Sequence, residues 1–215
     1  MISLVLVRHA ETAWVVEERF QGLTDVPLSP RGEEQARTVG RRLADTTATP
    51  SVPIPEGAPV GIWHSSLERA AATARAIAEA RAETALLMPR DDLIEVSGGA
   101  WEGLTATEIV ERWPTEYAAW RRDPSVAHPV GGEAPADGAV RVQRAVTAIV
   151  HEAASAASDH PWAMIVSHDG VLRLALLGLL GLPLTHYWSF PFSPAAVSVV
   201  EGTEAGIWRL RSHGA

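Results

Sequence analysis

The sequence contains no cysteine, no lysine and no asparagine, and all 18 of its basic residues are arginine. Without cysteine, disulfides and thiol nucleophiles are excluded, and the redox compartment stays open. Without lysine, Schiff-base chemistry and the lysine of a phosphate-binding P-loop are excluded. Any covalent chemistry must therefore use another nucleophile.

Positive charge is scarce, with 18 basic residues against 26 acidic ones and a formal net charge of −8. Non-specific binding to nucleic acid or to an anionic membrane surface depends on a basic face. We therefore expect neither of these partners. A small anionic substrate would have to be attracted by a local cluster of arginines, because distant charges are screened by salt.

Long apolar runs are also missing. The run 2–7 is too short for a signal peptide, has no basic residue before it and leads directly into Arg8 and His9. The run 171–184 is interrupted by Arg173 and falls short of the ~20 apolar residues that a membrane span needs. We expect a cytoplasmic protein.

The 215 residues and 47% hydrophobic content are enough for one globular domain over residues 1–215. Apolar runs typical of strands alternate with segments of helical spacing. The expected strands are 2–7, 60–63 and 162–167 with a terminal hairpin of 196–200 and 206–210; the expected helices are 29–44, 65–82, 105–120 (one or two, broken near Pro114), 138–155 and 170–180; the expected loops are 45–59 and 123–138.

This order predicts a three-layer α/β fold with a doubly wound, mostly parallel sheet and helices on both faces. Ligands of such folds bind beyond the carboxyl ends of the strands. Residues 105–135 would form a small cap of helices and loops over that site.

A histidine directly follows each of two apolar strands, in Val7-Arg8-His9 and in Val166-Ser167-His168. If both strands are central and parallel, the two imidazoles meet at the same rim of the sheet. One such histidine would more often be structural, but two, one of them beside an arginine, favour an active site.

The residues around both histidines also match a known family. The segments that carry the match are Leu6-Val7-Arg8-His9-Ala10-Glu11-Thr12, Arg19-Phe20-Gln21-Gly22, Asp25-Val26-Pro27-Leu28-Ser29-Pro30-Arg31-Gly32, Ser65-Ser66-Leu67-Glu68-Arg69-Ala70, Leu93-Ile94-Glu95, Trp101-Glu102-Gly103-Leu104, Gly131-Gly132-Glu133 and Val166-Ser167-His168-Asp169-Gly170. This ordered set covers nearly the whole chain and resembles the histidine phosphatase superfamily, the phosphoglycerate mutase-like enzymes.

The resemblance implies a phosphatase that works through a phosphohistidine intermediate, with no metal and no other cofactor. His9 would be the nucleophile, Glu95 the proton donor, and the phosphoryl group would be surrounded by three further residues, Arg8, Arg69 and His168. The residues expected to bind the rest of a small phosphorylated substrate are Thr12, Gln21, Gly22, Arg122 and Asp169.

General chemistry supports these roles. A neutral imidazole is a nucleophile near neutral pH, and its second ring nitrogen can donate to a backbone carbonyl that fixes the tautomer. Phosphoryl transfer depends mainly on positioning and charge stabilisation, which two guanidinium groups and a second imidazole supply. Burial beside the phosphate should raise the pKa of Glu95, so that it can protonate the leaving oxygen.

Several of these residues have alternative roles. Glu102, and after it Glu11, are rivals of Glu95 as the acid, and Glu133 is either structural or part of the pocket. Asp169, where the family usually has Gly, should cap the following helix, although it could tune His168. Thr12 either contacts phosphate or caps a helix, while Trp14 and Trp101 are candidates for the pocket wall.

Two departures from the family bear on the substrate. Val15 stands where many relatives have an asparagine that contacts phosphate, and Ala10 replaces the commoner glycine. Both departures motivate an alternative hypothesis, a non-catalytic module that binds a phosphorylated ligand. Retention of the histidines, arginines and glutamate favours an enzyme.

The remaining alternative is a phosphoglycerate mutase. Mutases of this family carry a longer insertion, whereas only residues 104–130 separate Gly103 from Gly131 here, so a phosphatase is preferred. Arg121 and Arg122 qualify this preference because a similar pair contacts substrate in the mutases. The sequence specifies neither the natural substrate nor the oligomeric state, and a homodimer remains open.

Overall fold

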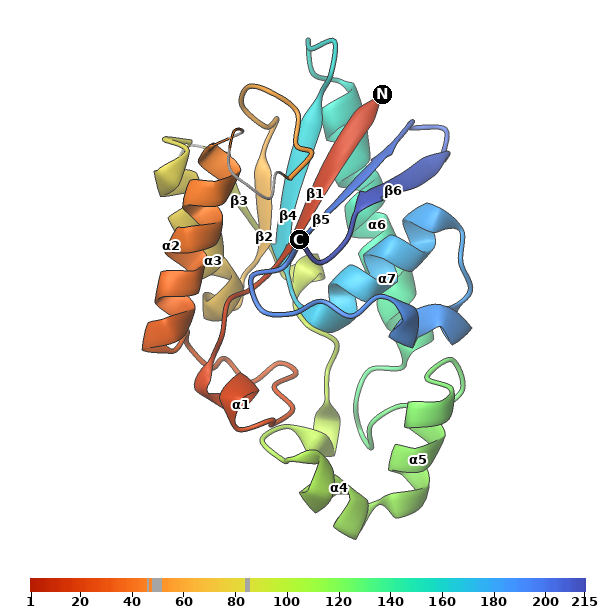
Figure 1. The fold of residues 1–215 in the computed structure, drawn as a ribbon. Coiled ribbons are helices and arrows are strands. Elements are labelled where there is room, and N and C mark those ends of the chain that lie inside the picture. The colour runs from red at the N-terminus through yellow and green to blue at the C-terminus, as the bar shows by residue number, and fades with distance from the viewer. Residues whose placement is uncertain (46, 48–51, 84–85) are drawn as a thin grey trace.

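The computed structural model describes residues 1–45, 47, 52–83 and 86–215, and these contain a six-stranded sheet (Figure 1). Its strands are β1 (Ile2–Arg8), β2 (Ile62–Ser65), β3 (Leu87–Arg90), β4 (Trp162–Ser167), β5 (Val197–Gly202) and β6 (Trp208–Ser212). Their order is β3-β2-β4-β1-β5-β6. The pairs β3/β2, β2/β4 and β4/β1 are parallel, whereas β1/β5 and β5/β6 are antiparallel. The expected mostly parallel sheet and terminal hairpin are confirmed.

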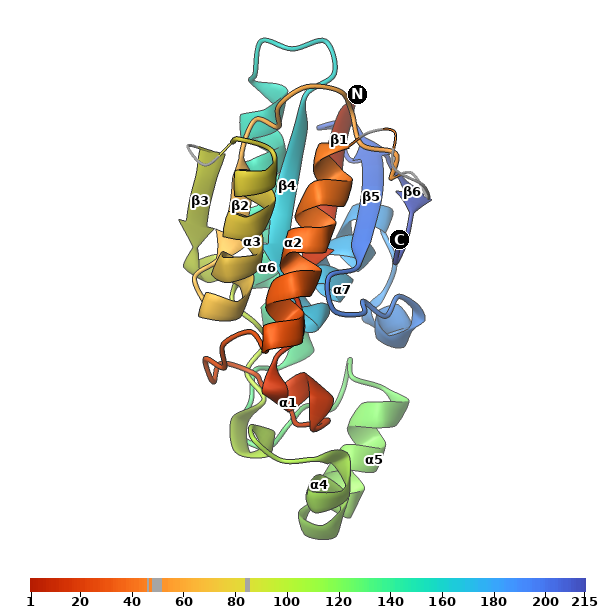
Figure 2. The same cartoon turned by 60° about the vertical axis from the view of Figure 1, so that its left-hand side comes forward.

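Helices cover both faces of the sheet and complete the three layers (Figure 2). One face carries α2 (Pro30–Ala44) and α3 (Glu68–Ala80), and the other carries α6 (Pro135–Ala154) and α7 (Asp169–Leu180). Helix α2 begins as its sequence predicts, because the hydroxyl of Ser29 accepts a hydrogen bond from the backbone N–H of Gly32.

The central strand β1 is buried on both faces. Leu4 and Leu6 pack into the hydrophobic cluster beneath α6 and α7, whereas Val5 and Val7 pack into the cluster beneath α2 and α3. This division follows from the two-residue period of a strand. β1 is therefore packed between two helical layers, which fix the position of the residues that follow its carboxyl end.

Short helices lie beyond the carboxyl ends of the parallel strands (Figures 1 and 2). They are α1 (Ala13–Val16), α4 (Ala106–Arg112) and α5 (Pro114–Arg122). Pro114 separates α4 from α5, as expected, and Thr105 with Glu108 forms a capping box that starts α4. These elements occupy the place expected for the cap.

One strand and the starts of two helices differ from the expectations, and β2, β5 and β6 lie one or two residues further along the chain than expected. Strand β3 was not expected, because it is short, lies at the sheet edge and contains Pro89, which a central strand would reject. Helix α6 starts at Pro135 rather than 138, since proline fits the first helical position. Helix α3 starts at Glu68 without the serine cap expected from Ser65 and Ser66.

The loop expected over 45–59 lies partly outside the described residues, and its described part, residues 45, 47 and 52–59, has no helix or strand. Within the described chain, no helix has both the length and the apolar content that crossing a bilayer requires.

Candidate active site

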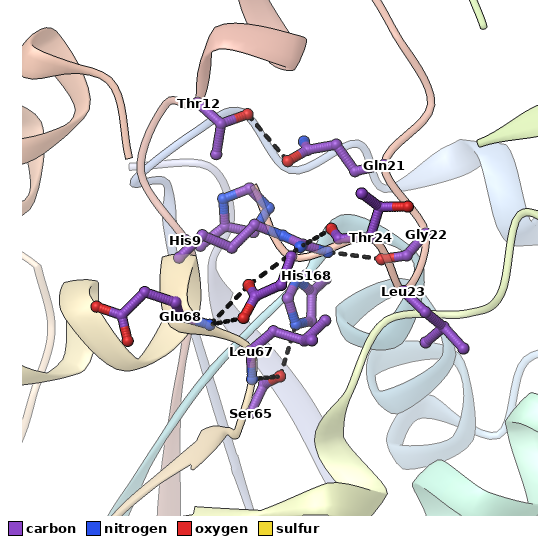
Figure 3. Close-up of polar contacts among 12 residues, drawn as sticks. His9, Thr12, Gln21, Gly22, Leu23, Thr24, Ser65, Leu67, Glu68 and His168 are labelled. Carbon is purple, nitrogen blue, oxygen red and sulfur yellow. Dashed lines mark hydrogen bonds and ion pairs between the residues drawn. The ribbon is translucent and has the colours of Figure 1, made fainter. Parts of the chain in front are cut away.

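The two histidines meet at the rim of the sheet, as the sequence predicts. Strands β1 and β4 are adjacent and parallel, and the N–H of His9 donates to the carbonyl of Ser167 at 2.8 Å. The two imidazole centroids are 5.1 Å apart, and Figure 3 shows both rings beside the loop that holds Gly22 and Thr24. Residues far apart in the sequence are thereby joined in one site.

His9 is oriented as a nucleophile. Its ring is 2% exposed, and Nδ1 lies 2.7 Å from the carbonyl oxygen of Ala10. A carbonyl only accepts, so Nδ1 carries the proton and Nε2 keeps its lone pair. Burial, and then the charges of Arg8 and Arg69, hold the pKa of His9 well below its usual value, so the ring is neutral at neutral pH.

His168 is held through its other ring nitrogen, Nε2. Its Nε2 lies 2.8 Å from the hydroxyl of Ser65, which itself accepts from the N–H of Leu67 at 3.2 Å (Figure 3). We assign the hydroxyl proton to the bond with Nε2, which places the imidazole proton on Nδ1. That Nδ1 is buried and has no partner among the described residues, and burial also lowers the pKa of His168 well below its usual value.

Arg69 is completely buried in the first turn of α3. Its terminal nitrogens donate to the carbonyl oxygens of Thr24 at 2.8 Å and Gly22 at 2.7 Å. Its Nε has no partner in the described chain. The 22–24 loop thus fixes the guanidinium, and its Nε N–H stays available for an anionic ligand.

Glu102 secures that loop rather than acting as an acid. Its carboxylate accepts from the N–H groups of Leu23, Thr24 and Gly98 at 3.0–3.1 Å and from the hydroxyl of Thr24 at 2.8 Å. Gly22, with φ +52°, permits this approach, because a Cβ there would lie 2.1 Å from a Glu102 oxygen.

Arg8 is the second guanidinium near His9. One terminal nitrogen donates to the carbonyl of Phe192, and its buried Nε has no partner within the described residues. Three unpaired N–H groups therefore lie around His9, on Arg8, on Arg69 and on His168. Phosphoryl oxygens are the acceptors that such an arrangement suits.

Glu95 lines the cavity and lies against the start of α7. Its carboxylate accepts from the N–H of Val96 at 2.9 Å and from those of Gly170 and Val171 at 3.3 Å each. Burial raises the pKa of Glu95, with Asp169 adding to the rise, although the Val96 bond opposes it. A Cβ on Gly170 would lie 2.7 Å from a Glu95 oxygen, so glycine is needed there.

Arg141 of α6 clamps the chain that leads to Glu95. It donates to the carbonyl oxygens of Asp92 at 3.1 Å and Ile94 at 2.8 Å. Its other two donors form a bidentate pair with Glu133 at 2.9 and 2.6 Å. One guanidinium therefore ties α6, the Gly-Gly-Glu turn and the Glu95 segment together.

These groups face one cavity of about 310 Å³. Among the residues singled out from the sequence, those that line it are Arg8, His9, Val15, Gln21, Gly22, Arg69, Glu95, Glu133 and Asp169. His168 is buried next to His9 and does not itself line the cavity. Thr12 is also buried and does not line the cavity. Arg122 is exposed at the end of α5 and does not line the cavity.

Thr12 and Asp169 have defined structural contacts. The hydroxyl of Thr12 caps α1 by accepting from Val15 N–H at 3.2 Å, and it donates to the Gln21 side chain at 2.9 Å. Asp169 does not cap α7, contrary to the expectation, because His168 occupies the cap position. The Asp169 carboxylate instead accepts from Arg173 at 2.9 Å and from the N–H of Phe192 at 3.0 Å.

The tryptophans expected in the pocket wall are not those found there. Trp101 is fully buried beneath the cap, and neither it nor Trp14 lines the cavity. The wall is formed by Phe20, Trp120, Tyr187 and Trp188 instead. Sequence reasoning missed these rings, together with Ser65 and Arg141, and the only available signal was the abundance of tryptophan.

Among the described residues, no group of three or more histidine, aspartate and glutamate side chains has an arrangement that could hold a metal ion. The charges at the cavity floor are instead those of two arginines.

Comparison with known proteins identifies the family of the chain. Residues 4–215 match the histidine phosphatase superfamily (branch 1), and the chain belongs to that superfamily. Phosphoserine phosphatase 1 of Hydrogenobacter thermophilus is 32% identical over 204 residues, which cover 95% of this chain and 88% of that protein. The adenosylcobalamin/alpha-ribazole phosphatase of Salmonella typhimurium is 32% identical over 205 residues, with 94% and 92% covered.

The fold of the family is confirmed by solved structures. A mycobacterial glucosyl-3-phosphoglycerate phosphatase in complex with VO3 superimposes with a TM-score of 0.85 at 29% identity, and the match covers 99% of each chain. The expected enzyme class, a phosphatase of this superfamily, is confirmed by these relatives.

Proposed function

We propose that the chain is a metal-independent phosphomonoesterase that hydrolyses a small phosphorylated metabolite through a phosphohistidine on His9. The observation that carries the proposal is the state of the His9 ring. Its Nδ1 is bonded to the Ala10 carbonyl, and its Nε2 has no hydrogen bond within the described residues and lies near the guanidinium groups of the part-buried Arg8 and the buried Arg69. Only a neutral nitrogen so placed combines a lone pair with a surrounding field that stabilises an anion.

In the first step, Nε2 attacks phosphorus, and the bond from phosphorus to the ester oxygen breaks. The Nε N–H groups of Arg8 and Arg69 and the Nδ1 N–H of His168 stabilise the phosphoryl oxygens. Glu95, whose pKa is raised by burial, delivers a proton to the leaving oxygen.

In the second step, water attacks the phosphohistidine. Glu95, now ionised, accepts a proton from that water, and the bond from phosphorus to Nε2 breaks. Inorganic phosphate leaves, and both His9 and Glu95 return to their starting states. Gln21 and Gly22, which line the same cavity, would contact the bound ester, whereas Thr12 would act by holding Gln21.

The test is hydrolysis of 4-nitrophenyl phosphate in the presence of a chelator, by the intact chain and by His9→Ala. We expect turnover that the chelator does not reduce and that His9→Ala abolishes. Binding of phosphate without turnover would instead support a non-catalytic module. Activity that depends on added 2,3-bisphosphoglycerate would support a mutase.

A further inference from the structure

Four aromatic side chains line the cavity and form an aromatic wall, defined here as Phe20, Trp120, Tyr187 and Trp188. Trp120 meets Trp188 edge to face with centroids 4.7 Å apart, and Trp188 meets Tyr187 in the same way at 4.9 Å. The ring centroids of Phe20 and Trp120 are 5.6 Å apart. Because the rings brace one another, the wall is a preformed surface for an apolar or ring-shaped group.

The arginines that line the cavity leave no cation for a second anionic group. Apart from Arg8 and Arg69, the arginine found in the lining among the described residues is Arg19. Its guanidinium is already bound by Glu17 at 2.8 Å, by Glu108 at 2.9 Å and by the carbonyl of Gly103 at 2.7 Å. A carboxylate of the substrate would enter without a partner, which costs free energy in a partly desolvated site.

The carboxylates that line the cavity also disfavour a second anionic group in the substrate. Glu133 and Asp169 are neutralised by Arg141 and Arg173, respectively. The side chain of Glu18 has no hydrogen bond or ion pair within the described chain, and the residue is an exposed part of the lining. Its backbone has φ +54°, a conformation that non-glycine residues rarely adopt. Such strain is often retained where a residue has a role in binding.

The arginine beside the aromatic wall does not supply the missing cation. Arg121 stacks on the ring of Trp188, with its guanidinium carbon 4.5 Å from the centroid, and it is exposed outside the cavity lining. Its effect inside is to support the wall.

We propose that this cavity selects monophosphates of ring-bearing alcohols that carry no second acidic group, with Trp120 providing the ring contact and Glu18 disfavouring anions. This inference rests on the proposed phosphatase function. It narrows the substrate class by two chemical criteria, a ring in the alcohol and the absence of a carboxylate or second phosphate.

Two isosteric substrates test the charge criterion, 4-carbamoylphenyl phosphate and 4-carboxyphenyl phosphate. The ratio of kcat/KM should favour the carbamoyl ester by about tenfold, since one unpaired charge in such a site is worth roughly 1.4 kcal/mol. Glu18→Gln should reduce that ratio by raising kcat/KM for the carboxylate ester. Glu111→Gln, which removes an exposed charge of the same sign outside the cavity, should leave the ratio unchanged.

The ring criterion is tested by Trp120→Ala with phenyl phosphate and glycerol 1-phosphate. KM should rise several-fold for the phenyl ester and little for the glycerol ester, because stacking is lost only for the ring. Equal kcat/KM for 4-carboxyphenyl phosphate and 4-carbamoylphenyl phosphate would overturn the inference while the phosphatase function stands. A preference for the carboxylate ester would do the same. Absence of turnover with every ester would overturn both.

Discussion

His9 and His168 differ in which ring nitrogen the protein engages, and that difference divides their roles. Nδ1 of His9 donates a hydrogen bond to the carbonyl of Ala10, which leaves the lone pair of Nε2 available. Nε2 of His168 is hydrogen-bonded to the hydroxyl of Ser65, which leaves Nδ1 available as a donor. The two side chains, 5.1 Å apart, are thereby suited to the different roles proposed for them, a nucleophile and a hydrogen-bond donor.

A substitution of Glu95 tests the proton donor at the residue scale. Glu95→Gln should lower kcat for an alkyl phosphate by about 10²–10⁴-fold, the usual contribution of general acid catalysis. The loss should be much smaller for 4-nitrophenyl phosphate, whose leaving oxygen needs no proton. Steady-state kinetics on both esters measure this, and equal losses on both would contradict the role.

The pH profile supplies an independent check of the same residue. The acid form of Glu95 is the active one, and burial raises its pKa above the usual carboxyl range. For an alkyl phosphate, kcat should therefore fall as pH rises through this raised pKa, and Glu95→Gln should remove that descending limb. A descending limb that persists in the variant would assign it to another group.

At the residue scale the sequence predicted which side chains meet, but not how they are held. His9, Arg8 and Arg69 could be named because their motifs are specific. The function of Glu102 in anchoring the 22–24 loop depends on backbone N–H groups of Leu23, Thr24 and Gly98, whose directions no sequence pattern reveals.

At the scale of elements, α6 positions the acid through Arg141. Arg141→Ala should release the segment that ends in Glu95, because four donated hydrogen bonds are lost. We expect the pattern of Glu95→Gln, a larger loss of kcat on an alkyl phosphate than on 4-nitrophenyl phosphate. Arg141→Lys should not restore activity, since an ammonium lacks the planar set of donors.

The matched control is Arg144→Ala, which removes an exposed arginine from the same helix. It should leave both substrates unaffected. A merely structural role of Arg141 would lower both activities equally and would leave the pH profile in place, and that result would contradict the positioning role.

Elements with a strong period were predictable, and those set by tertiary context were not. β1 and β4 are continuous apolar runs between helices, so their burial and parallel pairing followed. β3 is four residues long with Pro89 inside it, and it forms because β2 offers an edge. The first turn of α6 was hidden by the proline that starts it.

At the scale of the whole molecule, the buried histidines make folding depend on pH. The folded pKa of His9 and that of His168 lie well below the ordinary value of about 6.5, so the unfolded chain binds more protons than the folded chain below that pH. Their stabilising contribution is present above pH 6.5 and is lost as pH falls. Each contributes a slope of at most about 1.4 kcal/mol per pH unit.

We therefore expect the free energy of unfolding to fall between pH 7.5 and 5.5, and His168→Gln should flatten this dependence. Glu95 acts in the opposite sense, because its raised pKa makes the folded chain bind more protons, so the comparison is best made in the Glu95→Gln background. Denaturant titrations at several pH values measure it. An unchanged slope in the variant would show that His168 is not buried in its neutral form.

The composition of the cavity is also a property of the whole molecule. Trp120 comes from the cap and Trp188 from the turn after α7, and they meet only because the chain returns past the rim of the sheet. No local pattern marks such a pair, which is why the sequence pointed to Trp14 and Trp101 instead. The family's motifs fix the phosphoryl end of the site, whereas the fold fixes the other end.

The covalent state of His9 during turnover tests the central claim most directly. The chain is mixed with a ³²P-labelled aryl phosphate, quenched in the millisecond range with alkali, and digested for peptide mapping. We predict a label on the peptide that contains His9, stable in base and lost in acid, which forms and decays at rates consistent with kcat. Full turnover by His9→Ala, or turnover without any label on that peptide, would contradict the account.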